Sequence, residues 1–100
     1  MLKHIVMWTF KERAEGADKR QNAFRVKSML EGLREAIPEI RRIEVGVNIL
    51  DSPDSCDVVL CADFEDETAL RRYLDHPEHK RVVDFIGKVR LERKVVDFID

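Results

Sequence analysis

The chain has 100 residues, of which 38% are charged, and its net charge is only −2. A chain of this length forms one domain around a single core, here residues 1–100. The mixed charges exclude the basic face that nucleic-acid binding requires, and no apolar run approaches the ~20 residues that cross a bilayer. We therefore expect neither nucleic acid nor a membrane as a partner.

The two cysteines and the first ten residues indicate the cellular location that we expect for the protein. Cys56 and Cys61 are five positions apart on one extended segment, too distant to bridge each other. Unpaired cysteines favour a reducing environment. Met1–Phe10 continues directly into charged residues with no cleavage site, so we expect no signal peptide and a cytoplasmic location.

The first predicted element is a strand over Leu2–Phe10, which is rich in β-branched and aromatic residues. Both of its alternating faces are largely apolar, so we expect both to be covered. One face carries His4, Val6, Trp8 and Phe10, and the other carries Ile5, Met7 and Thr9. A polar loop over Lys11–Ala17 follows, with Gly16 as its pivot.

A long helix and two strands are predicted next. Asp18 and Gln21 form the capping-box pattern of a helix start, and Pro38 ends that helix. Its apolar stripe consists of Ala23, Val26, Leu30, Leu33 and Ile37. The strand over Ile40–Leu50 alternates apolar with polar or small residues, and the apolar ones are Ile43, Val45, Val47 and Ile49. A turn at Asp51–Ser55 follows. The next strand, over Asp57–Glu65, directs to one face the apolar residues Val58, Leu60, Ala62 and Phe64.

Pro77 divides the following helical segment in two, because proline lacks an N–H and disfavours helical geometry in the residue before it. A short helix capped by Glu65 or Asp66 ends near Asp75, and a second runs from Pro77 to about Gly87 with His76 as its cap. The inward residues of the first are Ala69, Leu70 and Tyr73, and the buried stripe of the second is His79, Val82, Val83 and Ile86. A last strand covers Leu91–Ile99.

This order of elements predicts an α+β fold with ferredoxin-like βαββαβ topology, in which helices cover one face of a four-stranded antiparallel sheet. The other face would still carry Ile5, Met7, Val96 and Phe98. A large exposed apolar patch is unusual in a monomer. We therefore predict a homodimer packed through these sheet faces, with a shared barrel core.

Several segments resemble the stress-responsive A/B barrel (Dabb) family, in the right order and over nearly the whole chain. They are Lys3–Lys11, Ile37–Ile40, Glu44–Asn48, Phe64–Asp66, Leu70 with Tyr73, His76–His79 and Val96–Phe98. The resemblance implies a dimeric α+β barrel. Family members include an olivetolic acid cyclase, which closes a linear polyketide by an intramolecular aldol reaction without a cofactor.

The resemblance assigns the working tyrosine and histidines of that cyclase to Tyr73, His79 and His4. His79 would act as the base, since an imidazole pKa near ~6.5 suits proton abstraction at neutral pH, and Tyr73 would donate to the developing oxyanion. His4 would orient them. The alternative is that His79 is a core histidine bonded to Tyr73 or to a backbone carbonyl. His76 is expected to be a structural cap and is not part of the working trio.

A pocket between the sheet and the helices is expected to bind a small apolar or aromatic molecule. Its predicted lining is Val6, Trp8, Val26, Leu30, Leu60 and Val83. The first helix carries smaller or polar residues where the cyclase has aromatic ones, and Trp8 adds a large ring, so we expect no pocket for a long polyketide.

We expect neither metal nor cofactor. His76 and His79, with Asp75 and Glu78 beside them, offer metal ligands, but the proline break aims the two histidines differently, and no glycine-rich phosphate loop is present. Three functions remain open: a small-ligand barrel, a cofactor-free acid–base enzyme of the cyclase or lyase type, and a structural module whose role is assembly.

Overall fold

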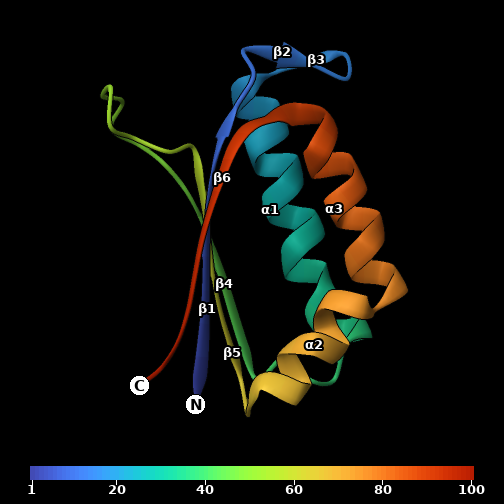
Figure 1. Ribbon diagram of the computed structural model, residues 1–100. Coiled ribbons are helices and arrows are strands. Elements are labelled where there is room, and N and C mark those ends of the chain that lie inside the picture. The colour runs from blue at the N-terminus through green and yellow to red at the C-terminus, as the bar shows by residue number, and fades with distance from the viewer.

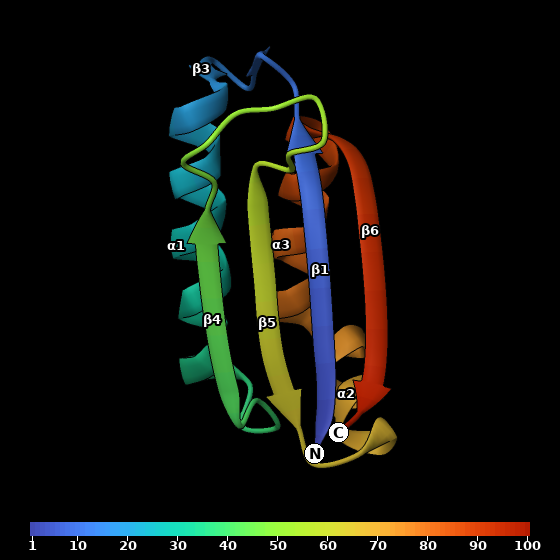
Figure 2. The same ribbon diagram turned by 90° about the vertical axis from the view of Figure 1, so that its left-hand side faces the viewer.

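The computed structural model describes residues 1–100. In it, helices cover only one face of a four-stranded antiparallel sheet (Figure 1). The strands lie in the order β4-β5-β1-β6, with β1 in an interior position (Figure 2). The elements are β1 (Leu2–Phe10), β2 (Arg13–Ala14), β3 (Ala17–Asp18), α1 (Lys19–Ala36), β4 (Arg42–Val47), β5 (Val58–Phe64), α2 (Glu67–Asp75), α3 (Pro77–Val89) and β6 (Arg90–Ile99). The predicted ferredoxin-like fold is confirmed.

The alternation of β1 determines what the two faces of the sheet contain. His4, Val6, Trp8 and Phe10 are all buried beneath the helices. Strand β1 pairs with β5 on one side and β6 on the other, so that Ala62 and Asp97 lie directly across from His4. Residues across from each other share a face, and the histidine therefore sits in the layer between sheet and helices.

The helix boundaries follow the predicted caps. The Asp18 side chain accepts from the Gln21 N–H, and the Gln21 side chain accepts from the Asp18 N–H, which completes the capping box of α1. Asp66 is the N-cap of α2, and its side chain accepts from the Ala69 N–H at 2.9 Å. His76 separates α2 from α3 and caps α3 through its ring.

Two predicted segments are wrong in detail. Strand β4 ends at Val47, and Ile49 is 88% exposed instead of buried. The chain leaves the sheet there, and the Asn48 side chain donates to the Leu50 carbonyl in the loop that follows. The predicted loop at Lys11–Ala17 contains the ribbon β2–β3, whose turn places Glu15 and Gly16 in the left-handed region (φ 52° and 76°) typical of tight hairpins.

Val83 also departs from its predicted place, since it is 50% exposed. The buried line of α3 is Val82, Ile86 and Val89, three positions that recur at helical spacing. Val83 is one position after Val82, so its side chain lies beside the buried line of α3 and not on it. Helix α3 also extends two residues beyond the predicted end at Gly87.

The second face of the sheet is bare in the single chain (Figure 1). The cross-strand pairs Ile5–Val96 and Lys3–Phe98 place both β6 residues on the face opposite His4. Met7, Val96 and Phe98 are exposed there. None of the helices is long and apolar enough to cross a membrane.

Candidate functional site

A small cavity of about 120 Å³ lies between the sheet and α3. It is lined by three titratable residues that the sequence singled out, namely His4, Tyr73 and His79. Five of the six predicted pocket residues also line it: Val6, Trp8, Leu30, Leu60 and Val83. Val26, a fully buried residue of α1, does not line it.

The three titratable residues of the cavity come from three different elements. His4 belongs to β1, Tyr73 to the last turn of α2 and His79 to the first turns of α3. The rings of Tyr73 and His79 have centroids 4.3 Å apart, and those of Tyr73 and His4 are 6.0 Å apart. A phenol and two imidazoles therefore meet at one cavity.

Tyr73 is completely buried, and its hydroxyl has no hydrogen-bond partner. Burial raises the pKa of this phenol above its ordinary value, with the positive charge of Arg93 as a weaker opposing influence. The hydroxyl therefore stays protonated and can donate. Asn22 Oδ1 is the other buried polar atom without a partner, but Asn22 does not line this cavity, and its amide nitrogen is bonded to the Ala14 carbonyl.

The tautomer of His79 follows from the helix break. In a continuous helix the Glu78 N–H would bond to the Leu74 carbonyl, four residues earlier. Here it donates instead to Nδ1 of His76, at 3.1 Å. The Leu74 carbonyl is thus left for His79, whose Nδ1 lies 3.2 Å from it. Because a carbonyl only accepts, Nδ1 carries the proton and Nε2 keeps its lone pair.

Burial lowers the pKa of His79 below its ordinary value of 6.5. The hydrogen bond to the Leu74 carbonyl acts in the opposite direction and raises the pKa, whereas the charges of His4, Arg93 and His76 lower the pKa further. A neutral imidazole with a free Nε2 can accept a proton at neutral pH. The site therefore holds one donor, the Tyr73 hydroxyl, and one acceptor, the His79 Nε2.

Asp97 is a partner of the site that sequence reasoning missed. Its Oδ1 lies 2.5 Å from Nδ1 of His4, so Nδ1 donates to the carboxylate and Nε2 of His4 is the free nitrogen. The signal was present in the alternation of the last strand, in which Asp97 shares a face with Val95 and Ile99. The sequence alone did not say that this face of β6 lies across from His4.

Arg90 and Arg93 also line the cavity and were not singled out from the sequence. Arg90 follows the last residue of α3, and Arg93 lies directly across from Trp8 in β6. Arg93 therefore belongs to the helix-covered face of the sheet, where its charge reaches both Tyr73 and His79.

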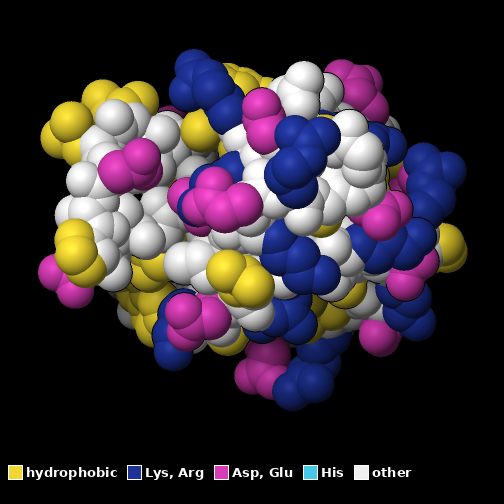
Figure 3. Space-filling view, turned by 90° about the horizontal axis from the view of Figure 1, so that it is seen from above, with side chains coloured by type: hydrophobic (Ala, Val, Ile, Leu, Met, Phe, Trp, Pro, Cys, Tyr) yellow, Lys and Arg dark blue, Asp and Glu magenta, His cyan; other side chains and the backbone are white.

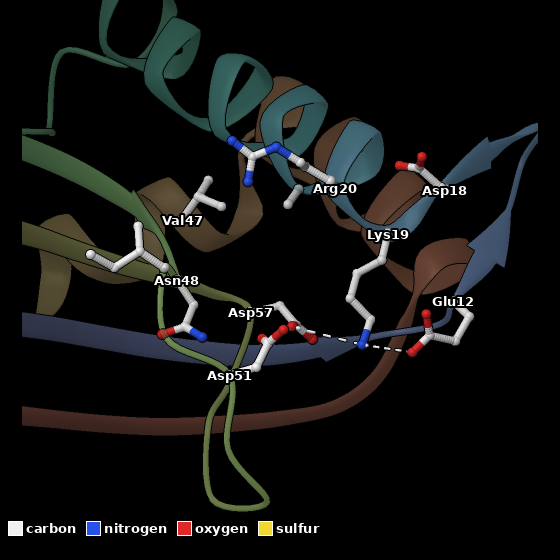
Figure 4. A pocket seen from close by; sticks show the side chains of 10 residues that line it. Glu12, Asp18, Lys19, Arg20, Val47, Asn48, Asp51 and Asp57 are labelled. Carbon is white, nitrogen blue, oxygen red and sulfur yellow. Dashed lines mark ion pairs between the residues drawn. The ribbon is translucent and has the colours of Figure 1, made fainter.

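A second and larger hollow, of about 460 Å³, lies beside the start of α1 (Figure 4). Three of its charged groups form ion pairs, since Lys19 Nζ is 3.1 Å from Glu12 Oε1 and 3.9 Å from Asp57 Oδ1. The hydrogen bond to Glu12 raises the pKa of Lys19. Seen from above, basic and acidic side chains are interspersed on this end of the molecule (Figure 3). Asp18 caps α1 and Arg20 lies over the Phe24 ring, so most of the charged groups here have partners within the chain.

No cluster of three or more histidine, cysteine or carboxylate side chains converges to hold a metal ion. His76 directs its Nδ1 to the Glu78 N–H and His79 directs its Nδ1 to Leu74. The Nδ1 atoms of the two histidines are thus used in two separate backbone bonds.

Comparisons with known proteins agree with this architecture. A family model described as the stress responsive A/B barrel domain matches residues 2–100. A dimeric protein of unknown function and ferredoxin-like fold from Bacteroides fragilis is 25% identical, with a TM-score of 0.81 over 97% of this chain and 93% of that chain. A search of curated proteins found no match.

Two other solved structures are similarly close in fold. A dimeric ferredoxin-like protein of unknown function from Thermobifida fusca is 26% identical, with a TM-score of 0.81 over 97% of this chain and 88% of that chain. A hydroxynitrile lyase from Passiflora edulis also has a TM-score of 0.81, over 99% of this chain and 92% of the lyase, but only 14% of its residues are identical. The second likeness shows the fold alone.

The lowered pKa of His79 predicts a pH-dependent stability. The unfolded chain binds the proton at its ordinary pKa of 6.5, whereas the folded protein binds it only at lower pH. This contribution to stability is therefore complete above pH 6.5 and is lost as the pH falls below it. Urea unfolding should show a larger loss of unfolding free energy between about pH 7.5 and 5.5 in the wild type than in His79→Gln. Equal losses would show that His79 titrates alike in both states.

Proposed function

The chain belongs to the stress-responsive A/B barrel family, and from that premise we propose that it is a homodimer in which each protomer binds one small ring-sized molecule. The ligand occupies the cavity between the sheet and α3. The observation that carries this proposal is the Tyr73 hydroxyl, which is buried at the cavity without a hydrogen-bond partner.

An unpartnered buried hydroxyl is costly. Leaving such a group unsatisfied destabilises a protein by ~1–3 kcal/mol, and native structures rarely tolerate it unless the group has a function. A ligand oxygen placed in the cavity would accept the hydrogen bond. Because burial raises the pKa of Tyr73, the hydroxyl remains a donor throughout the neutral range.

The size of the cavity limits the ligand. Its volume of about 120 Å³ is close to that of an engineered apolar cavity of ~150 Å³ that binds benzene, and well below the ~300–1,000 Å³ of sites for drug-sized ligands. Trp8 fills part of the layer between sheet and helices. A single ring with a carbonyl or hydroxyl oxygen therefore fits, and a long folded polyketide does not.

Acetophenone, a ring with one carbonyl oxygen, is a suitable probe. NMR titration should show shifts confined to the cavity residues, and Tyr73→Phe should weaken binding by about fivefold, the effect of losing one hydrogen bond of ~1 kcal/mol. The same variant should unfold at equal or higher urea concentration, because it removes the unpaired hydroxyl. A destabilised Tyr73→Phe would mean that the hydroxyl has a structural partner.

Gly87 provides a matched pair of controls. It lines the cavity, is exposed and has no heavy atom within 4 Å of an added Cβ. Gly87→Phe should obstruct the cavity and abolish the shifts, whereas Gly87→Ala should bind normally and fold more stably by up to ~1 kcal/mol. If acetophenone shifts no cavity residue in the wild type, the ligand proposal fails and the assembly function gains support.

A second candidate, acid–base catalysis, is favoured by the free Nε2 of His79. This nitrogen would take a proton from a carbon next to a ligand carbonyl, and the Tyr73 hydroxyl would donate to the enolate oxygen that forms. The electron pair of the broken C–H bond forms a C=C bond, the π pair of the carbonyl moves to the oxygen, and return of the proton to carbon restores both groups. His4, held by Asp97, would fix the neighbouring ring.

Deuterium exchange tests this chemistry without knowledge of the natural substrate. In D₂O the protein should accelerate exchange of the methyl protons of acetophenone, and His79→Gln should lower the rate by ~10²-fold or more with binding largely retained. Tyr73→Phe should lower it as well. Exchange that is unaffected by His79→Gln would leave binding as the sole function of the cavity.

The bare sheet face supports the homodimer. Ile5, Met7, Val96 and Phe98 form an apolar strip along β1 and β6, and Ile49 and Leu50 are exposed on a loop that projects to the same side (Figure 1). A second copy packed on this face would cover both. Two proteins of similar structure are described as dimeric.

Charge placed on that face should separate the protomers. Val96→Lys puts an ammonium in the apolar strip and is expected to yield a monomer by light scattering. Val95→Lys is the matched control: this residue is 46% exposed against 53% for Val96, and it lies on the opposite face. Dissociation by the control, or a dimeric Val96→Lys, would place the interface elsewhere.

A further inference from the structure

The cavity has a charge asymmetry that binding of a neutral ring does not require. Arg90 and Arg93 line it, whereas no aspartate or glutamate does. The nearest carboxylate of the site, Asp97, is bonded to His4. The local charge at the cavity is therefore positive, in a protein whose net charge is −2.

Both arginines lie where the cavity meets solvent. The exposed lining residues are Val83, Gly87 and Arg93, and Arg90 is half-buried, while His4, Leu60 and Tyr73 are buried. The opening thus runs between α3 and β6, and the hydroxyl of Tyr73 lies on the buried side. A ligand entering there would pass the guanidinium groups first.

Neither guanidinium has a protein partner. No ion pair of the chain includes Arg90 or Arg93, in contrast to Arg41, which pairs with Glu65 at 2.8 Å. Arg90 has a local role, because a positive charge at the end of α3 offsets the negative end of the helix dipole. Arg93 belongs to no helix and has no such role, so it carries the argument.

We infer that the ligand of this cavity is a small carboxylic acid, whose ring or short chain lies against the apolar lining and whose carboxylate binds Arg93 at the opening. The inference rests on the ligand-binding function proposed above and adds the class of ligand. A guanidinium presents a planar pair of N–H donors that matches the two oxygens of a carboxylate. Tyr73 then donates to a second oxygen at the buried end.

The probe that contains all of these features is 4-acetylbenzoate, which has a ring, a carbonyl oxygen and a carboxylate at opposite ends. Its neutral isostere, 4-acetylbenzamide, differs only in charge. NMR titration of the wild-type protein should give a Kd for the carboxylate about tenfold lower than for the amide, and the preference should shrink as the salt concentration rises.

Variants of the two basic groups near the opening separate specific recognition from general attraction. Arg93→Gln should abolish the preference for the carboxylate and leave the affinity for 4-acetylbenzamide unchanged. Arg93→Lys should keep part of the preference for the carboxylate, because the positive charge remains but the planar pair of N–H donors is lost. Lys88→Gln removes an equal charge from an exposed position of α3 that does not line the cavity and should preserve the preference.

The outcomes distinguish the two proposals. If both probes bind equally to the wild type, or if the preference survives Arg93→Gln, the inference about the carboxylate is wrong while ligand binding stands. If neither probe, nor acetophenone, shifts the cavity residues, ligand binding itself is wrong. A preference that Lys88→Gln removes as fully as Arg93→Gln would show long-range attraction only, and would also overturn the carboxylate site.

Discussion

The interruption of helical hydrogen bonding at His76 and Pro77 is the constraint on which the site depends. Proline supplies no N–H to the Tyr73 carbonyl, which accepts from His76 instead. The Glu78 N–H turns to the His76 ring, and the Leu74 carbonyl becomes available to His79. One covalent feature therefore ends α2, begins α3 and sets which nitrogen of His79 is protonated.

The proposed ligand site and the proposed dimer interface lie on opposite faces of the sheet, and β1 contributes to both. Its helix-covered face supplies His4 to the cavity, and its bare face supplies Ile5 and Met7 to the apolar strip. A one-residue slip of β1 would exchange the two sets. The position of the cavity and the proposed dimer interface are thus fixed by the same register, although they lie on opposite sides of the sheet.

The polar groups of the cavity are unusual for a core of this size. Tyr73 lacks a hydrogen-bond partner, and His79 is held neutral by burial, which lowers its pKa. A leucine or phenylalanine at either position would pack without that cost. We explain a core that keeps an unpaired donor beside a neutral acceptor by the ligand proposed above rather than by stability. In that proposal, the two arginines at the opening face the negatively charged end of the ligand.

The sequence by itself determined the order of the main elements and their caps, because periodicity, proline and capping residues act within a few residues along the chain, whereas the trio of His4, Tyr73 and His79 was assigned through the family resemblance of its motifs. It misplaced Ile49 and Val83, whose exposure depends on where the chain leaves the sheet and how α3 is rotated. Only the tertiary structure decided that Asp97 lies across from His4, that Arg93 faces the cavity, and that the cavity measures about 120 Å³. These properties depend on pairing between β1 and β6, which are more than eighty residues apart, and no local pattern specifies the partner or the register of such distant strands.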